Sequence, residues 1–115
     1  MKFILLNILF LSLIYSDTFE NVQILDFESK RDLIKYMKSI GKDLGVKCSH
    51  CHNMDDKSVD TPAKATTREM IKLTQYLNGL LNSHFEDTTS HKTYVSCWTC
   101  HFGTLHPVAK RPIEE

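Results

Sequence analysis

Two short cysteine motifs hold the residues of this chain that are best suited to chemistry. Residues 48–52 read CSHCH and residues 97–101 read CWTCH, so each follows the pattern Cys-x-x-Cys-His. This is the attachment signature of a c-type haem, in which two thiols add to the haem vinyl groups and the adjacent imidazole binds the iron. Cysteines three apart on one turn face the same way and can span one porphyrin edge. The pattern predicts two haem c groups, attached at Cys48, Cys51, Cys97 and Cys100, with His52 and His101 as proximal iron ligands.

Other chemistries use the same residue types. Paired C-x-x-C knuckles can hold structural zinc, which would make the chain a zinc-stabilised interaction module. Cysteines of an exported protein can form disulfides, and a C-x-x-C pair can be a thioredoxin-like redox centre. In a further alternative, one motif carries haem and the other is vestigial. Two haems are favoured because the motif occurs twice, with histidine each time, and uses all 4 cysteines of the chain.

The second axial ligand of each iron decides the function. A strong ligand in this position prevents other molecules from binding the iron, so that only electron transfer remains possible. An empty or weakly filled position permits ligand binding or peroxide chemistry. Met37 and Met70 lie on apolar stripes of expected helices, where spacing alone leaves both a core and a ligand role open. The remaining candidates are expected to be packing or solvent-facing residues, namely Met54, His50, His84, His91 and His106.

The beginning of the chain has the composition of a targeting segment. Residues 3–15 are apolar except for Asn7 and Ser12, and they follow Lys2. That length suits the hydrophobic part of a secretory signal peptide and is short for a bilayer span. We expect a signal peptide over residues 1–16, with an imprecise cleavage site and a retained membrane anchor as the alternative. Export to the periplasm agrees with haem c, which bacteria attach outside the cytoplasm.

The rest of the chain fits one small domain. From residue 17 onward the net charge is near −1, so nothing indicates a nucleic-acid partner. An entry segment over residues 17–29 is followed by a dihaem domain over residues 30–107 and a loose tail over residues 108–115.

Hydrophobic periodicity predicts a helix before each motif. The first is expected over residues 30–44, from an N-cap at Ser29 to a stop at Gly45. The second is expected to begin at Thr61-Pro62 and to end at residue 78 or 82, with Asn78-Gly79 as an early stop signal. No convincing strand is found, so the expected fold class is mainly α, with two helix-then-CxxCH units. The expected apolar stripes comprise Leu33, Ile34, Met37, Ile40 and Leu44 in the first helix, and Ala63, Met70, Leu73, Leu77 and Leu80 or Leu81 in the second.

The order of residues between 30 and 107 resembles the cytochrome subunit of photosynthetic reaction centres. In that family a methionine on the helix before each haem supplies the second axial ligand. The resemblance therefore implies Met37 with His52 at the first haem, and Met70 with His101 at the second. The family subunit carries four haem motifs, so this chain resembles half of it, and Phe102 stands where the family often has Arg. The resemblance is carried by Met37, Leu44-Gly45-Val46-x-Cys48-x-x-Cys51-His52-Asn53, Asp60-x-Pro62-x-Lys64, Thr67-Arg68-x-Met70, Tyr94-Val95-x-Cys97-x-x-Cys100-His101-x-Gly103 and Pro107.

These patterns predict a periplasmic electron-transfer protein rather than an enzyme. Two haems in about 100 residues must lie close together, so the chain would relay single electrons between redox partner proteins. Lys35, Lys38 and Lys42 share one face of the first helix, which either steers acidic partners or is an ordinary solvated face. The alternative function is a haem enzyme or sensor with one five-coordinate iron that binds peroxide or a diatomic gas. That alternative requires Met37 or Met70 to be a core residue only.

Overall fold

The computed structural model describes residues 19–85 and 94–108, and all of its regular elements there are helices. The expected mainly α fold, with a helix before each motif, is therefore confirmed. The segment expected to be a signal peptide, the stretch containing His91 and most of the expected tail lie outside the described residues. Among the residues that are described, no helix combines the length and apolar character needed to cross a membrane. The elements are α2 (Lys30–Leu44), the 3-10 helix η1 (Cys48–His50), α3 (Pro62–Phe85) and α4 (Cys97–His101).

Both ends of α2 form as the sequence predicts. The Ser29 side chain accepts a hydrogen bond from the Asp32 backbone N–H at 3.1 Å and donates one to the Asp32 carboxylate at 2.7 Å. At the other end Gly45 adopts the left-handed conformation with φ 66°, and the Val46 N–H reaches back to the Gly41 carbonyl at 2.9 Å. These caps satisfy backbone groups that the helix leaves without partners. They explain why α2 occupies the predicted residues.

α3 is longer than the sequence predicted. Its start is as expected, because the Thr61 hydroxyl accepts from the Lys64 N–H at 3.1 Å. The helix then runs through Gly79 to Phe85, so the predicted end at residue 78 or 82 was wrong. A glycine inside a helix costs only about 1 kcal/mol relative to alanine, so Gly79 does not by itself end the helix. His84, expected in a loop, consequently lies in the last turn of α3.

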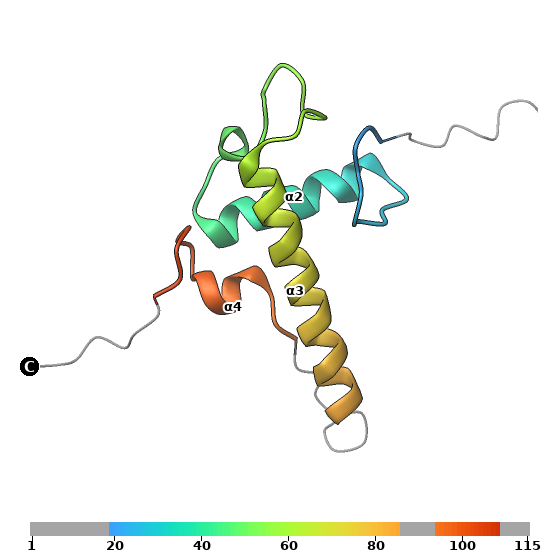
Figure 1. The fold of residues 1–115 in the computed structure, drawn as a ribbon, viewed down its shortest axis with the longest axis vertical. Coiled ribbons are helices and arrows are strands. Elements are labelled where there is room, and N and C mark those ends of the chain that lie inside the picture. Colours follow the sequence, from blue (N-terminus) through green and yellow to red (C-terminus); the bar gives the residue numbers. More distant parts are fainter. Residues whose placement is uncertain (1–18, 86–93, 109–115) are drawn as a thin grey trace, which may run out of the picture.

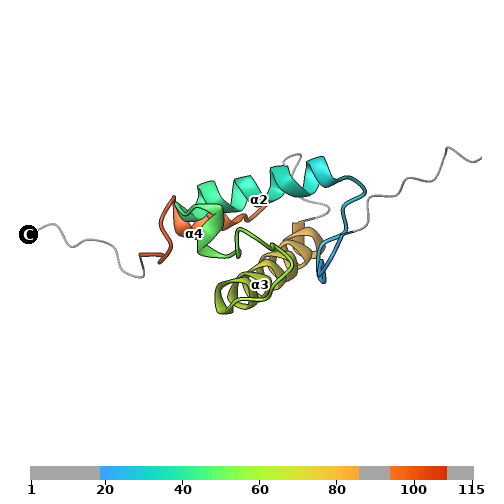
Figure 2. The same cartoon turned by 90° about the horizontal axis from the view of Figure 1, so that it is seen from above.

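The protein core is small and lies where α3 crosses α2. Ile40 and Leu44 of α2 pack with Ile71 of α3, and within the described residues these three side chains are the buried core. Figure 1 shows α3 crossing α2, and Figure 2 shows α3 in a separate layer from α2. Ile71 was not in the predicted stripe. Partly buried residues surround the core, namely Ile24, Leu25, Tyr36, Met37, Val46 and Cys97.

The C-terminal half of α2 brings the two motifs close together. In Figure 1 it lies between η1 and α4, and both of these elements contact it. The Gly103 N–H, just after the second motif, donates to the Asp43 carbonyl at 2.9 Å. A Cβ atom on Gly45 would lie only 2.1 Å from the Gly103 carbonyl oxygen. The two motif-bearing units therefore meet backbone to backbone at this Gly45–Gly103 joint.

Candidate functional site

The first motif is fastened to the beginning of α3. Within η1 and the turn after it, the His52 N–H donates to the Cys48 carbonyl at 2.9 Å, which folds the motif into a compact turn. The Thr61 hydroxyl donates to the Cys51 carbonyl at 2.6 Å. The Thr67 hydroxyl, on the second turn of α3, lies 3.8 Å from the Cys51 sulfur. The helix that should serve the second motif thus also supports the first.

The imidazole of His52 is oriented by a backbone carbonyl. Its Nδ1 lies 3.2 Å from the Lys57 oxygen, in the loop after the motif. Because a carbonyl oxygen can only accept, this contact requires a proton on Nδ1 and leaves the Nε2 lone pair available. A histidine that binds a metal through one ring nitrogen usually donates the other N–H to such an acceptor. His52 therefore has the tautomer that an iron ligand needs.

The second motif repeats this arrangement on a short α-helix. At the start of α4 the Ser96 N–H donates to the Thr99 hydroxyl at 2.9 Å, as half of a capping box. The helix ends at Phe102, which adopts the left-handed conformation with φ 49°. The Nδ1 of His101 lies 3.0 Å from the Thr104 carbonyl oxygen, so its Nε2 is also left available. Both motifs thus present the same pair of thiols and the same histidine tautomer.

Asn78 fixes the position of the segment that precedes the second motif, and the sequence did not predict this role. Its side-chain oxygen accepts from the Val95 N–H at 2.8 Å, and its side-chain NH₂ donates to the Val95 carbonyl at 2.9 Å. This two-point contact ties the segment before Cys97 to α3. The Asn-Gly pair is a local signal for a helix stop, but the Asn78 amide instead bonds to a residue 17 positions away.

The four cysteines form no disulfide with one another and remain in two separate pairs. Cys48 and Cys100 are exposed, and Cys51 and Cys97 are partly buried. Within the described residues, which include every cysteine, no three side chains of the His, Cys, Asp and Glu types converge as a metal-binding group. Zinc knuckles made from both pairs therefore have no geometric support. Burial, aided by the Asp43 carboxylate, raises the pKa of the Cys97 thiol.

Apolar side chains flank the motifs without being covered by protein. Met70 is 43% exposed and shares an open face of α3 with Leu73 and Leu77. Trp98 and Phe102 of the second motif are 46% and 67% exposed, and their ring centroids lie 5.9 Å apart. Soluble proteins rarely leave so many large apolar residues open unless something covers them. A flat apolar disc attached at the thiols would fit these surfaces.

The two methionines occupy different settings. Met37 is partly buried against the core on α2, whereas Met70 is exposed on α3. Met70 lies one turn beyond Thr67, which contacts the first motif, and two turns before Asn78, which holds the approach to the second. The structure thus places Met70 between the points where α3 holds the two motifs.

The other candidate ligands lie on the surface. Met54 is 51% exposed. Exposed settings are also found for His50, His84 and His106.

The comparisons with known proteins agree with this geometry. Residues 13–111 match the family model described as the photosynthetic reaction centre cytochrome C subunit. The chain is also similar to cytochrome c-554 of Chloroflexus aurantiacus, with 32% identity over 83 residues, which cover 70% of this chain and 20% of that protein. The chain therefore spans about a fifth of the length of this curated relative. Because the family model covers most of the sequence, the chain belongs to the family of the photosynthetic reaction centre cytochrome c subunit.

Proposed function

We propose that this protein is a dihaem c-type cytochrome that transfers single electrons between redox partner proteins. One haem is attached at Cys48 and Cys51, and the other at Cys97 and Cys100. The observation that carries the proposal is the repeated histidine geometry. His52 and His101 each hold Nδ1 against a backbone carbonyl, at 3.2 Å and 3.0 Å, and keep Nε2 for iron. Family membership supports the same cofactor chemistry.

Each residue of the site has a separate task. The haem iron supplies one-electron exchange between its ferric and ferrous forms. Met37 and Met70 would each bind one iron through the thioether sulfur, as the family resemblance implies. Thioether sulfur is soft and favours ferrous iron, so it raises the potential relative to a second histidine. The open apolar face of α3, with Trp98 and Phe102, then covers porphyrin and keeps water away from it.

The Gly45–Gly103 joint between the two motif-bearing units supports an electron relay. The hydrogen bond from Gly103 to the Asp43 carbonyl holds the residues flanking the two motifs in direct contact. Segments held in this way would keep the two proposed haems close enough to exchange electrons, with one edge left for a donor and another for an acceptor. We propose that the protein works in the periplasm, with residues 1–16 as its signal peptide. It would be bound to the membrane only if that segment is retained as an anchor.

Mass spectrometry of protein made in a cell that attaches haem c tests the proposal. Two haems should be found on the intact chain, and the replacement of either cysteine pair by alanine should remove one of them. The C48A/C51A and C97A/C100A variants serve as controls for each other. A bare polypeptide mass would refute the proposal.

A spectrum separates electron transfer from the enzyme or sensor alternative. With both irons closed by methionine, the ferric protein should show the weak near-infrared band of sulfur ligation. The reduced protein should not bind carbon monoxide. Carbon monoxide binding by the native reduced protein would mean that one iron is five-coordinate.

A further inference from the structure

A cation shares the hydrogen-bond acceptor of the first motif histidine. The side chain of Lys64, in the first turn of α3, is only 11% exposed. Its Nζ donates to three successive carbonyls, those of Lys57 at 3.1 Å, Ser58 at 3.1 Å and Val59 at 3.0 Å. An ammonium has three N–H groups, so these bonds use all of them. The Lys57 oxygen is also the acceptor that orients His52, at 3.2 Å.

The second motif lacks this arrangement within the described residues. His101 donates to the Thr104 carbonyl at 3.0 Å, and no charged side chain among residues 19–85 and 94–108 donates to that oxygen. The Thr104 hydroxyl instead donates to the carbonyls of His101 and His106, at 2.6 Å and 3.1 Å. The two histidines thus have the same tautomer but different surroundings.

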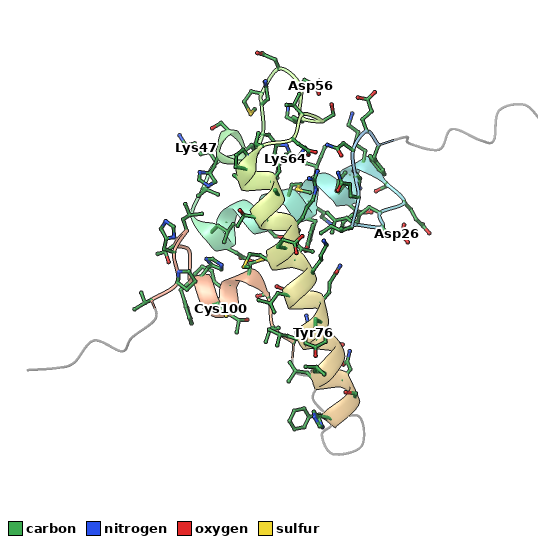
Figure 3. The ribbon with its side chains drawn as sticks, in the orientation of Figure 1. Asp26, Lys47, Asp56, Lys64, Tyr76 and Cys100 are labelled. Atoms are coloured by element: carbon green, nitrogen blue, oxygen red, sulfur yellow. The ribbon has the colours of Figure 1, made fainter. Side chains whose placement is uncertain are left out.

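The positive charge of Lys64 is only partly balanced. The Asp60 carboxylate lies 3.6 Å from Lys64 Nζ but bonds more closely to Arg68 Nη2, at 2.7 Å, and to the Asn21 side chain, at 2.8 Å. Asp56 lies on the same loop, but its carboxylate is bound by Ser58 and open to solvent, where water screens its charge. Figure 3 shows Lys64 at the start of α3, below the loop that carries Asp56.

Two physical effects of this lysine act in the same direction. A strong acceptor on Nδ1–H makes a histidine more basic and stabilises ferric iron. A carbonyl that already binds an ammonium is a weaker acceptor, so His52 gives less of this support. The positive charge also disfavours the additional charge of ferric iron, and its low exposure limits screening by solvent. Both effects favour the ferrous form of the first haem.

We propose that Lys64 is a positioning residue that raises the reduction potential of the first haem relative to the second. The inference rests on the proposed function, with two haems and with His52 and His101 as ligands. Where this makes the first potential the higher of the two, one electron would pass from the ferrous second haem to the ferric first haem, with no bond formed or broken. The electron would then reside on the haem attached at Cys48 and Cys51 until an acceptor takes it.

Redox titration of the dihaem protein tests this proposal in the Lys64→Met, Lys64→Arg and Lys72→Met variants. Lys64→Met should lower one of the two potentials and leave the other in place, whereas Lys64→Arg should retain most of the native value. Lys72 is the matched control, because it lies on the same helix, is 52% exposed and pairs with Glu69. Its replacement should move neither potential. Paramagnetic NMR of the ferric protein should show that the haem-methyl signals that move belong to the haem at Cys48 and Cys51.

A second variant gives a shift of the opposite sign. Asp60→Asn removes the carboxylate that partly offsets Lys64, so the same potential should rise. If Lys64→Met does not acquire its first haem, the Asp60→Asn variant tests the proposal in its place. If Lys64 had a purely structural role, its replacement would change the spectrum, but the reduction potential would not shift in opposite directions in Lys64→Met and Asp60→Asn.

The outcomes separate this inference from the proposed function. Absence of haem from the first motif of the native protein would overturn both. A dihaem protein in which Lys64→Met moves neither potential, or both equally, would overturn the role of Lys64 alone. An unchanged or lowered potential in Asp60→Asn would do the same.

Discussion

Met37 and Met70 are the proposed second ligands of the two irons, and each proposal can be tested by a separate replacement. Met37→His or Met70→His should lower one reduction potential, because imidazole favours ferrous iron less than thioether does. The near-infrared band of sulfur ligation should lose part of its intensity. Met54→His is the matched control, since Met54 is 51% exposed and should leave both potentials unchanged. Unaltered spectra and potentials in both ligand variants would show that these methionines are not ligands.

Asp60 should make the stability of the loop after the first motif depend on pH. The hydrogen bond from Arg68, followed by that from Asn21, lowers the pKa of this carboxyl below its usual 3.8. A lowered pKa in the folded state adds stability above the unfolded-state pKa, and this stability is lost as the pH falls through the folded pKa. Urea unfolding should therefore show the native protein losing more stability than Asp60→Asn between about pH 5 and pH 2. Parallel pH curves for the two proteins would contradict this.

The residues that sequence reasoning identified are those whose chemistry lies in local spacing. Each CxxCH motif can be recognised from five consecutive letters, and in the structure the Nδ1 of each motif histidine lies against a backbone carbonyl. The roles of Lys64 and Asn78 depend on carbonyls in separate segments. A lysine or asparagine on a helix is usually a surface residue, so no local signal could reveal these contacts.

At the scale of elements, replacing either of two glycines by alanine should change the stability of the protein in opposite directions. Gly45→Ala should destabilise the protein by more than about 2 kcal/mol, because the left-handed backbone alone costs about 1–2 kcal/mol. Its Cβ would also lie 2.1 Å from the Gly103 oxygen. Gly79→Ala is the control within a helix, and no atom lies within 4 Å of its added Cβ. This change should stabilise α3 by roughly 0.5–1 kcal/mol in denaturant unfolding. Equal effects of the two changes would argue against the joint.

Asn78→Ala should loosen the second motif selectively. It leaves the Val95 N–H and carbonyl without their partners, at a cost of roughly 1–3 kcal/mol. Asn82→Ala, an exposed change one turn along α3, should have little effect on stability. Denaturant unfolding measures the cost, and the spectrum of each haem shows where the disturbance lies. If the two variants behave alike, the contact with Val95 does not hold the second unit in place.

The bounds of the helices were predictable where both ends carry their own signals. Ser29 and Gly45 cap α2 with their own side chain or backbone, so its residues could be predicted correctly. The end of α3 could not, because Asn78 bonds to Val95 rather than to its own helix end. Long-range partners of this kind override a local stop signal.

At the scale of the whole molecule, the interior formed by the described residues is small. Burial in the described residues is confined to Ile40, Leu44 and Ile71, which is small beside the entropy cost of ordering the chain. The variant with all four cysteines changed to alanine should therefore be unfolded or molten, with amide protons that exchange rapidly with solvent. Slow exchange across α2 and α3 in that variant would show that the polypeptide folds without its cofactors.

The sequence could predict the helical fold class but not how its units meet. Hydrophobic stripes indicated two helices, yet much of the α3 stripe is open and the buried contact is made by Ile71. Periodicity shows which side chains are apolar and cannot show whether protein or cofactor covers them. The approach of Gly45 to Gly103 was likewise invisible, since no pattern connects residues so far apart.

That joint has a consequence for how such proteins can diversify. It is made of main-chain atoms, which have no rotamers and are unaffected by most side-chain substitutions outside the two glycines themselves. The separation of the two redox centres would therefore be insulated from mutations on the outer surface. Docking patches could change to suit new donors and acceptors while the internal electron-tunnelling step kept its rate.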